Sequence, residues 1–160
     1  MGTRGRIAAL ATLVAALGSA VPLAQAAASD CPTVFNATIQ YELTSASCTG
    51  SVCTFVFTGS GGSTLGPVTD TNVVVQDFGS TPCSTYTAEH TFSFANGDTL
   101  TAVGSGTVCG VPGGLASFIT GTSAVTSGTG TLEGASGTLT DQGVISQNAP
   151  VVRFHGTLDC

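Results

Sequence analysis

The sequence predicts an all-β protein, most simply an antiparallel eight-stranded β-barrel, with a β-sandwich as the alternative. Three observations favour this class. Apolar and polar residues alternate in about eight segments, which is typical of strands that bury one face. Turn-forming residues separate these segments at intervals of about 8–12 residues, as in sandwiches and barrels. The 160 residues include 22 Gly and 26 Thr and only 8% charged residues, a composition that disfavours helices.

Residues 1–28 are predicted to be a secretory signal peptide, and residues 29–160 a single barrel domain. Two arginines precede an apolar run at residues 7–17, and the small residues at 24–28 suit a cleavage site. The apolar run is shorter than the roughly 20 residues that cross a bilayer. We therefore expect a secreted, extracellular protein with no stable membrane association after cleavage.

The first three strands are expected in the N-terminal part of the domain. From Phe35 to Leu43, apolar residues at odd positions alternate with polar residues at even positions, so one face should be buried. Residues 52–58 form the second expected strand, which ends at a flexible break rich in Gly and Ser at 59–63. The valines at 73–75 mark the third strand.

The clearest alternation lies in residues 84–95, and it predicts a fourth strand. The dipeptide Asn-Gly at 96–97 is a strong hairpin signal, so residues 99–108 should return as the fifth strand. A three-residue loop would place Phe92 opposite Ala102. The last three strands are expected at residues 115–126, 131–146 and 151–158.

Six cysteines follow the signal, and an even number in a small exported domain predicts disulfides. One pair encloses a four-residue loop. A second pair flanks the hairpin and would lie as diagonal neighbours on its two strands. The remaining pair joins the two ends of the domain by elimination. The predicted disulfides are Cys48–Cys53, Cys83–Cys109 and Cys31–Cys160.

The charged residues exclude several partners. Without the signal, Arg153 is the one Lys or Arg residue left against nine Asp and Glu residues, so we expect no binding of nucleic acid. The sequence contains no Cys-x-x-Cys pair and no His at zinc-ligand spacing from a Cys, so neither a metal nor a cofactor is expected. Glu89, Arg153 and His155 lie on polar faces and are expected at the surface. The oligomeric state is left open.

Three residues are candidates for binding a ligand. Tyr41, Tyr86 and His90 lie on the apolar faces of their strands. Inside a barrel they would point polar tips into an apolar space, as groups that orient a ligand do. His90 has the ordinary pKa of a general acid or base near neutrality. The alternative is that all three are core residues whose polar atoms are hydrogen-bonded locally.

Residues 119–137 resemble part of the allene oxide cyclase and dirigent-like β-barrels. The shared pattern is a turn, Gly-Thr-Gly, an apolar residue and Gly-Ala-x-Gly, and it falls on Gly128, Gly130, Leu132, Gly134, Ala135 and Gly137. With weaker matches, the likeness covers roughly residues 85–158. It implies an eight-stranded antiparallel barrel that holds a hydrophobic small molecule, and in some members steers a cyclisation or a radical coupling. No catalytic residue carries over, because no matching positions exist, and the cysteines are an addition.

A second likeness is to secreted antibiotic carriers of the neocarzinostatin type, which share the composition and a hairpin like that of Cys48 and Cys53. The sequence therefore predicts a secreted barrel that binds a small hydrophobic molecule and has no catalytic motif. If it is an enzyme, the first resemblance implies cyclase or isomerase chemistry. The alternatives are a structural or cell-envelope protein, an antibiotic carrier, and a protease inhibitor presenting the loop at 109–114.

Overall fold

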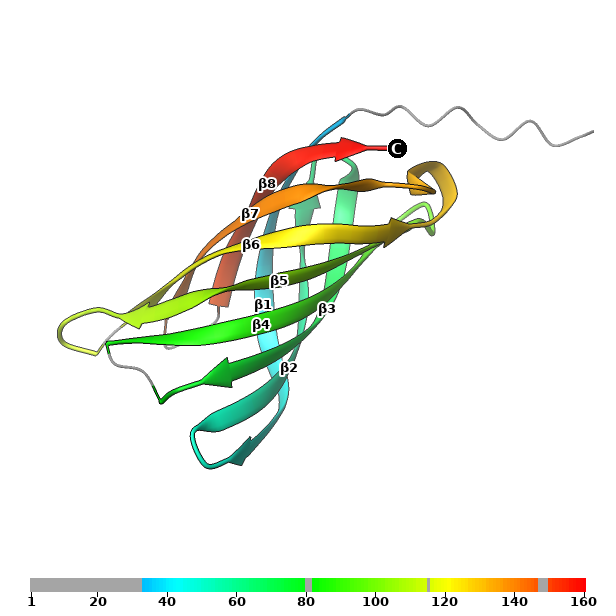
Figure 1. The fold of residues 1–160 in the computed structure, drawn as a ribbon. Helices are drawn as coiled ribbons and strands as arrows, with labels where there is room; N and C mark the ends of the chain where they lie inside the picture. Colours follow the sequence, from blue (N-terminus) through cyan, green and yellow to red (C-terminus); the bar gives the residue numbers. More distant parts are fainter. Residues whose placement is uncertain (1–32, 80–81, 115, 147–149) are drawn as a thin grey trace, which may run out of the picture.

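The alternating segments form eight antiparallel strands that close into a barrel (Figure 1). The computed structural model describes residues 33–79, 82–114, 116–146 and 150–160. Each strand pairs with the next one along the chain, and the last pairs with the first. The barrel is confirmed, and the sandwich is not adopted. The strands are β1 (Thr33–Thr49), β2 (Val52–Ser63), β3 (Gly66–Asp77), β4 (Cys83–Phe94), β5 (Thr99–Gly110), β6 (Ala116–Gly128), β7 (Ser136–Ser146) and β8 (Pro150–Asp159).

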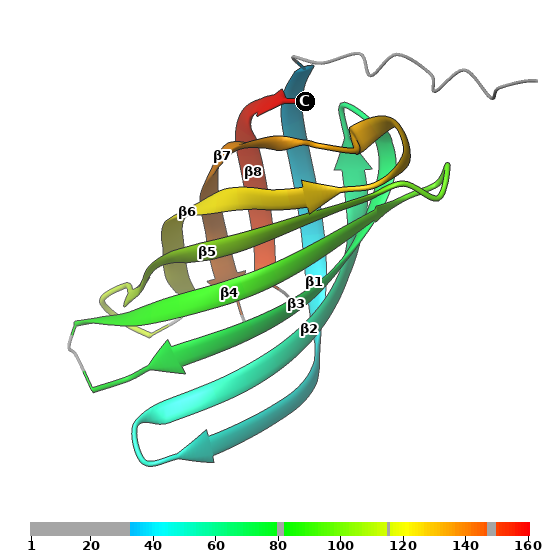
Figure 2. The same ribbon diagram turned by 45° about the vertical axis from the view of Figure 1, so that its right-hand side comes forward.

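The two ends of the barrel differ. The closed end, where β4 ends at Phe94 and β8 ends at Asp159, is filled by apolar side chains of the core, including Phe94, Leu100 and Leu158. The open end is where β3 ends at Asp77 and β4 begins. There β1 extends beyond β8 (Figure 2), because it pairs with β8 no further than Gln40, while β2 stays paired with β3 as far as Asp77.

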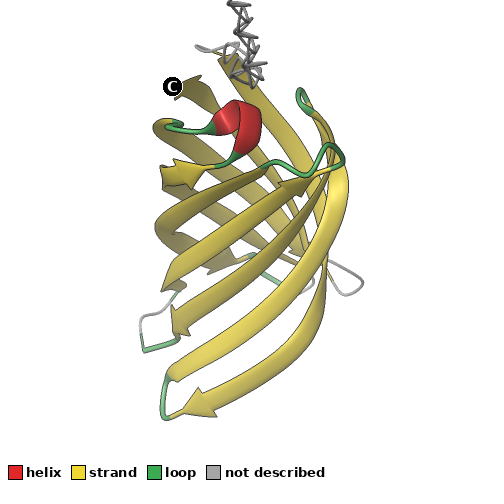
Figure 3. Cartoon of the chain, turned by 90° about the vertical axis from the view of Figure 1, so that its right-hand side faces the viewer, coloured by secondary structure: helices red, strands yellow, loops and turns green. Residues whose placement is uncertain are grey.

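A single-turn 3-10 helix, Gly130–Leu132, lies at the closed end (Figure 3). The predicted strand at 131–146 is therefore wrong in its first residues, and β7 starts at Ser136. The turn buries the Leu132 side chain in the core, while the Thr131 backbone N–H and hydroxyl both donate to the Asp98 carboxylate. These hydrogen bonds, led by that of the Thr131 hydroxyl, lower the pKa of Asp98.

A flexible break was expected at the Gly- and Ser-rich segment 59–63. This segment instead forms the second half of β2. Gly59 lies under the ring of Tyr41, where a Cβ atom would come within 2.6 Å of the Tyr41 side chain. A side chain there would collide with the barrel interior, so this glycine serves close packing inside a strand.

The β4–β5 register is also shifted from the expected one. Phe92 lies opposite Leu100, whereas His90 lies opposite Ala102. The reason is that the turn is centred on Asn96, one residue earlier than expected. The Phe94 N–H donates to the Asp98 carbonyl, and the Asp98 N–H donates to the side-chain oxygen of Asn96. The register that results places Cys83 directly opposite Cys109 and not diagonal to it.

Two of the predicted disulfides are confirmed, Cys48–Cys53 and Cys83–Cys109. Both lie towards the open end, where they tie β1 to β2 and β4 to β5. Cys31 lies outside the described residues, as do the predicted signal peptide and its cleavage site. The Cys31–Cys160 pair therefore stays a prediction.

Removing the Cys83–Cys109 bridge should cost more stability than removing the Cys48–Cys53 bridge. The first closes a sequence separation of 26 residues and the second one of 5. The longer loop restricts the unfolded chain more, so the paired Ala variants should lose about 3 and about 2 kcal/mol of unfolding free energy respectively. Urea denaturation followed by circular dichroism measures both values. The reverse order would show that the bridges act mainly through the folded state.

Candidate functional site

The half of the barrel interior nearest the open end contains a cavity that is partly open to solvent. The centre of a water molecule can reach about 60 Å³ of it. A single water needs roughly 10–15 Å³ by the same kind of measure, so the cavity is several times larger than a water site. Its walls are largely apolar, with side chains such as Phe57, Val108, Ile119 and Phe154. The polar lining residues are Tyr41, Asn72, Gln76, Tyr86, His90 and Asp141.

The deepest polar cluster centres on the carboxylate of Asp70. Its Oδ2 atom accepts a hydrogen bond from the Tyr41 hydroxyl at 2.6 Å and lies 2.8 Å from Nδ1 of His90. An ionised carboxylate can only accept, so Nδ1 of His90 carries a proton and donates it. Burial, and then the charge of Asp70, raise the pKa of Tyr41 well above its ordinary value. Tyr41 is therefore a neutral donor at any physiological pH.

His90 is held on both sides by aromatic rings. Its ring stacks on Phe92 with centroids 5.4 Å apart and meets Phe154 edge-on at 5.0 Å. Together with the Asp70 hydrogen bond, these contacts fix the imidazole in one orientation at the cavity wall. A side chain fixed in this way can orient a guest without losing conformational freedom when the guest binds.

A second buried carboxylate, Asp141, lies across the cavity on β7. Its Oδ2 atom accepts a hydrogen bond from the Ser123 hydroxyl at 2.5 Å. Burial raises the pKa of Asp141, although the Ser123 hydrogen bond and the charge of His90 oppose that shift. Burial, and then the charge of Asp141, also raise the pKa of Tyr86. The two residues therefore lie close enough to interact electrostatically.

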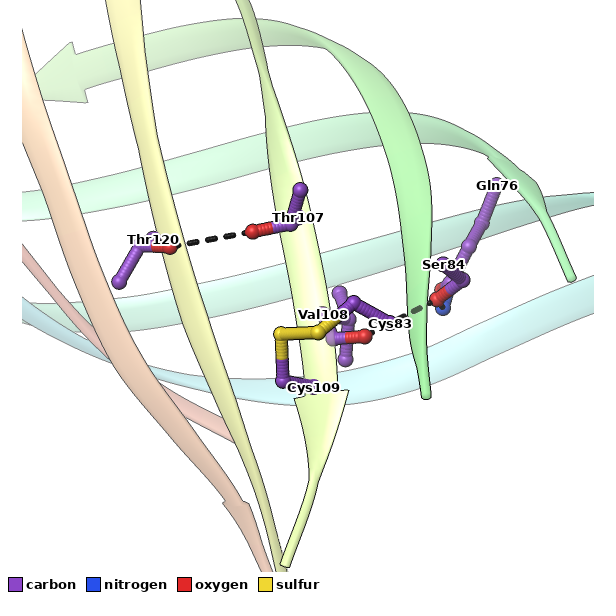
Figure 4. The surroundings of a disulfide bond; sticks show 7 residues. All are labelled: Gln76, Cys83, Ser84, Thr107, Val108, Cys109 and Thr120. Carbon is purple, nitrogen blue, oxygen red and sulfur yellow. Dashed lines mark hydrogen bonds between the residues drawn. A yellow bond between two sulfur atoms is a disulfide. The ribbon is translucent and has the colours of Figure 1, made fainter. Parts of the chain in front are cut away.

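Closer to the open end, a short chain of hydrogen bonds links β3, β4 and β5. Nε2 of Gln76 donates to the Ser84 hydroxyl at 2.5 Å, and that hydroxyl donates to the Val108 carbonyl. Figure 4 shows these residues beside the disulfide between Cys83 and Cys109. The disulfide therefore braces the same strand ends that carry the outer part of the cavity wall.

Three buried oxygen atoms in this interior have no hydrogen-bond partner among the described residues. They are Oδ1 of Asp70, Oδ1 of Asn72 and Oδ1 of Asp141. All three are acceptors, and Asn72 and Asp141 line the cavity. A buried acceptor without a partner costs about 1–3 kcal/mol. The barrel interior therefore presents acceptors to which hydrogen-bond donors can bind.

The structure brings the three candidate residues together. Tyr41, Tyr86 and His90 all line the cavity, although their role in binding a ligand stays a prediction. Tyr41 and His90 also fit the alternative that they are core residues with locally paired polar atoms, because both are hydrogen-bonded to Asp70. The polar-face residues Glu89, Arg153 and His155 are exposed, as expected.

Sequence reasoning missed the two carboxylates and Asn72. In β3, Asp70 and Asn72 point inward while Val73 and Val75 face solvent, which reverses the usual assignment of polar and apolar faces. One signal was present in β7. Asp141 has the same parity as Leu139, which is apolar and buried, so it had to share the inward face of that strand.

No family model, curated protein or solved structure matches this chain. The resemblance to allene oxide cyclase and dirigent-like barrels stays a prediction, and the function must rest on the geometry of the interior. Within the described ranges, no helix is long and apolar enough to cross a membrane. In the same part of the chain, no three His, Cys, Asp or Glu side chains gather as metal ligands would.

Asp141→Asn should change how stability depends on pH. Because burial raises the pKa of Asp141 in the folded protein above 3.8, the folded state binds its proton more tightly than the unfolded state does. This contribution to stability is complete below pH 3.8 and is lost as pH rises through the folded pKa. Asp141→Asn has no carboxyl at this position and does not lose this contribution. The unfolding free energy of the variant minus that of wild type should therefore increase from acid to neutral pH.

Urea denaturation at several pH values measures the difference. The exposed carboxyl groups of Asp77 and Asp98 have lowered pKa values and act in the opposite direction, but they are the same in both proteins and cancel. Glu89→Gln, which removes an exposed carboxyl from β4, is the matched control and should show no such trend. A constant difference between Asp141→Asn and wild type at all pH values would contradict the prediction.

Proposed function

We propose that this protein binds a small, largely apolar molecule inside its barrel and does so outside the cell. The observation that carries the proposal is the cavity at the open end, which combines apolar walls with a few fixed polar groups. This combination is typical of ligand sites, where the apolar wall supplies affinity and the polar groups supply orientation. The cavity volume of about 60 Å³ is smaller than the roughly 150 Å³ that encloses a benzene ring, so a guest of about one ring would extend into the open mouth of the cavity.

Two further features support the proposal. Among the described residues the closed end is packed with side chains, so we infer that a guest enters at the opposite end, near the strand ends that Cys83–Cys109 ties together. Disulfides form and persist in oxidising compartments, which is compatible with an extracellular site. The secretory signal predicted from residues 1–28 agrees with that location.

Filling part of the cavity should weaken binding. Ala88 lines the cavity on β4, and Ala88→Leu would occupy part of the space with three more carbon atoms. Toluene, a single-ring probe, should bind wild type in a titration followed by NMR chemical shifts. Its affinity for Ala88→Leu should fall by at least about tenfold, because a well-packed wall has little room to adjust.

Ala124→Leu is the matched control, since Ala124 is exposed on β6, and it should bind toluene like wild type. His90→Phe, with His155→Phe as its exposed counterpart, gives a second test should Ala88→Leu not fold. His90→Phe should alter toluene affinity while His155→Phe does not. If wild type binds neither toluene nor a one-ring compound that carries a polar group, or if interior and exterior variants bind toluene equally, the proposal is overturned and the structural or cell-envelope alternative is favoured.

A further inference from the structure

The charges inside the barrel do not balance. Among the described residues, the buried carboxyl groups are those of Asp70 and Asp141, and the buried base is His90. The chain has no Lys, and Arg153, the one arginine in those residues, is exposed on the outer wall. Protonating His90 would compensate one carboxylate, the neighbouring Asp70. The negative charge of Asp141 would remain without a cation from the protein.

The buried polar atoms that lack a hydrogen-bond partner are also all acceptors. Asp141 is 2% exposed and Asn72 is 8% exposed, and each has a buried oxygen that lacks a partner. Both residues line the cavity. A carboxylate oxygen and an amide oxygen accept hydrogen bonds and do not donate them. A guest that satisfies them must therefore supply N–H or O–H groups, and a positive charge suits Asp141 best.

We propose that the guest is a protonated amine on an apolar body of about one ring, with its ammonium group bound by Asp141. This inference rests on the proposed function and specifies its ligand class. An ammonium group has three donors, and the free Oδ1 atom of Asp141 can accept one of them. The cavity walls also carry the aromatic rings of Tyr41, Tyr86 and Phe154, and aromatic faces attract cations.

Four one-ring probes of nearly equal size show whether binding depends on the charge of the guest or on its shape. Benzylamine is a cation at pH 7, benzyl alcohol is a neutral donor, toluene is apolar and benzoate is an anion. Isothermal titration calorimetry on the wild-type protein should rank them in that order. Benzylamine should bind at least about tenfold more tightly than benzyl alcohol, because its hydrogen bond to the carboxylate is charge-assisted. Benzoate should not bind.

Asp141→Asn should weaken benzylamine binding by at least about 30-fold, the effect of removing one partner of a buried charged pair. The same variant should bind toluene like wild type, which also shows that its cavity is intact. Glu89→Gln, which removes an exposed carboxyl from the outer wall, should leave the affinity for benzylamine unchanged and so exclude a general effect of net charge.

The outcomes separate the two proposals. If toluene and benzyl alcohol bind but benzylamine has no advantage, the amine inference is wrong and the proposed function stands. The inference is equally overturned if benzylamine binds Asp141→Asn as tightly as wild type. If none of the four probes binds, the proposed function itself fails. The free acceptors would then accept hydrogen bonds from ordered water.

Discussion

Replacing Phe92 with alanine should lower the free energy of unfolding by about 3–5 kcal/mol. The side chain is 0% exposed and lies at the centre of an aromatic cluster. Its ring centroid is 5.6 Å from that of Phe35 and 5.1 Å from that of Phe154, and it also stacks on His90. Alanine would leave a void between the closed end and the cavity, and the surrounding strands are fixed by their pairing and cannot collapse into it.

Urea denaturation followed by circular dichroism measures this loss. The matched control is Phe118→Ala, because Phe118 is 52% exposed on the outer wall of β6. It should change the unfolding free energy by about 0.5 kcal/mol or less. Similar losses for the two variants would mean that the barrel interior is not the core of the protein.

Replacing Asp70 with alanine should cost about 3–5 kcal/mol as well, because removing one partner of a buried pair leaves the other groups without compensation. Here the groups left behind are the Tyr41 hydroxyl and Nδ1 of His90, both buried donors that share one oxygen of Asp70. Asp70→Asn keeps an oxygen acceptor at nearly the same place, so its loss should be smaller.

The same denaturation experiment compares these variants with Glu89→Ala, which removes an exposed carboxyl and should have little effect. If Asp70→Ala is as stable as Glu89→Ala, the hydrogen bonds to Tyr41 and His90 contribute nothing to folding. In that case the orientation of His90 would depend on its aromatic neighbours Phe92 and Phe154 alone.

The buried carboxyl group of Asp141 is more typical of a binding site than of a core that serves stability alone. A core made for stability alone would replace Asp141 with an apolar residue, since burial raises the pKa of Asp141 and therefore works against its charged form. Proteins often retain such groups at binding sites at the expense of stability. The expected rise in the relative stability of Asp141→Asn from acid to neutral pH and its expected loss of amine binding are two effects of the same carboxylate.

The faces of several strands could be predicted from sequence. In β1 the odd positions from Phe35 to Tyr41 are buried as expected, but Leu43, which was expected on the same face, is 55% exposed. In β8 the same holds for Val152, Phe154 and Leu158. A period of two is a direct consequence of strand geometry, so alternation alone identifies the inward face where that face is apolar.

The inward polar residues could not be predicted in the same way. Asp70 is buried because Tyr41 and His90 supply its donors, and these lie 29 and 20 residues away along the chain. Asp141 likewise depends on Ser123 from a neighbouring strand. Such pairs are set by which strands lie side by side and in which register, and local sequence patterns carry little of that information.

The β4–β5 register shows how a small error in the predicted position of a turn changes every cross-strand pair of a hairpin. The Asn-Gly dipeptide at 96–97 correctly predicts the hairpin, but the hydrogen bonds of Phe94, Asn96 and Asp98 centre the turn one residue earlier than expected. Every cross-strand pair then shifts by two positions, which keeps each side chain on its predicted face. Tyr86 therefore faces inward as expected, although it lies opposite Gly106 and not Val108.

The central claim is that the barrel interior holds a small guest, and nuclear Overhauser effects between bound toluene and protein methyl groups test it most directly. Ala88 and Val152 line the cavity, whereas Val73 and Val103 are exposed on the outer wall. We predict contacts from the toluene protons to the first two methyl-bearing residues and none to the other two. Contacts confined to Val73 and Val103, or no contacts at all, would contradict the claim.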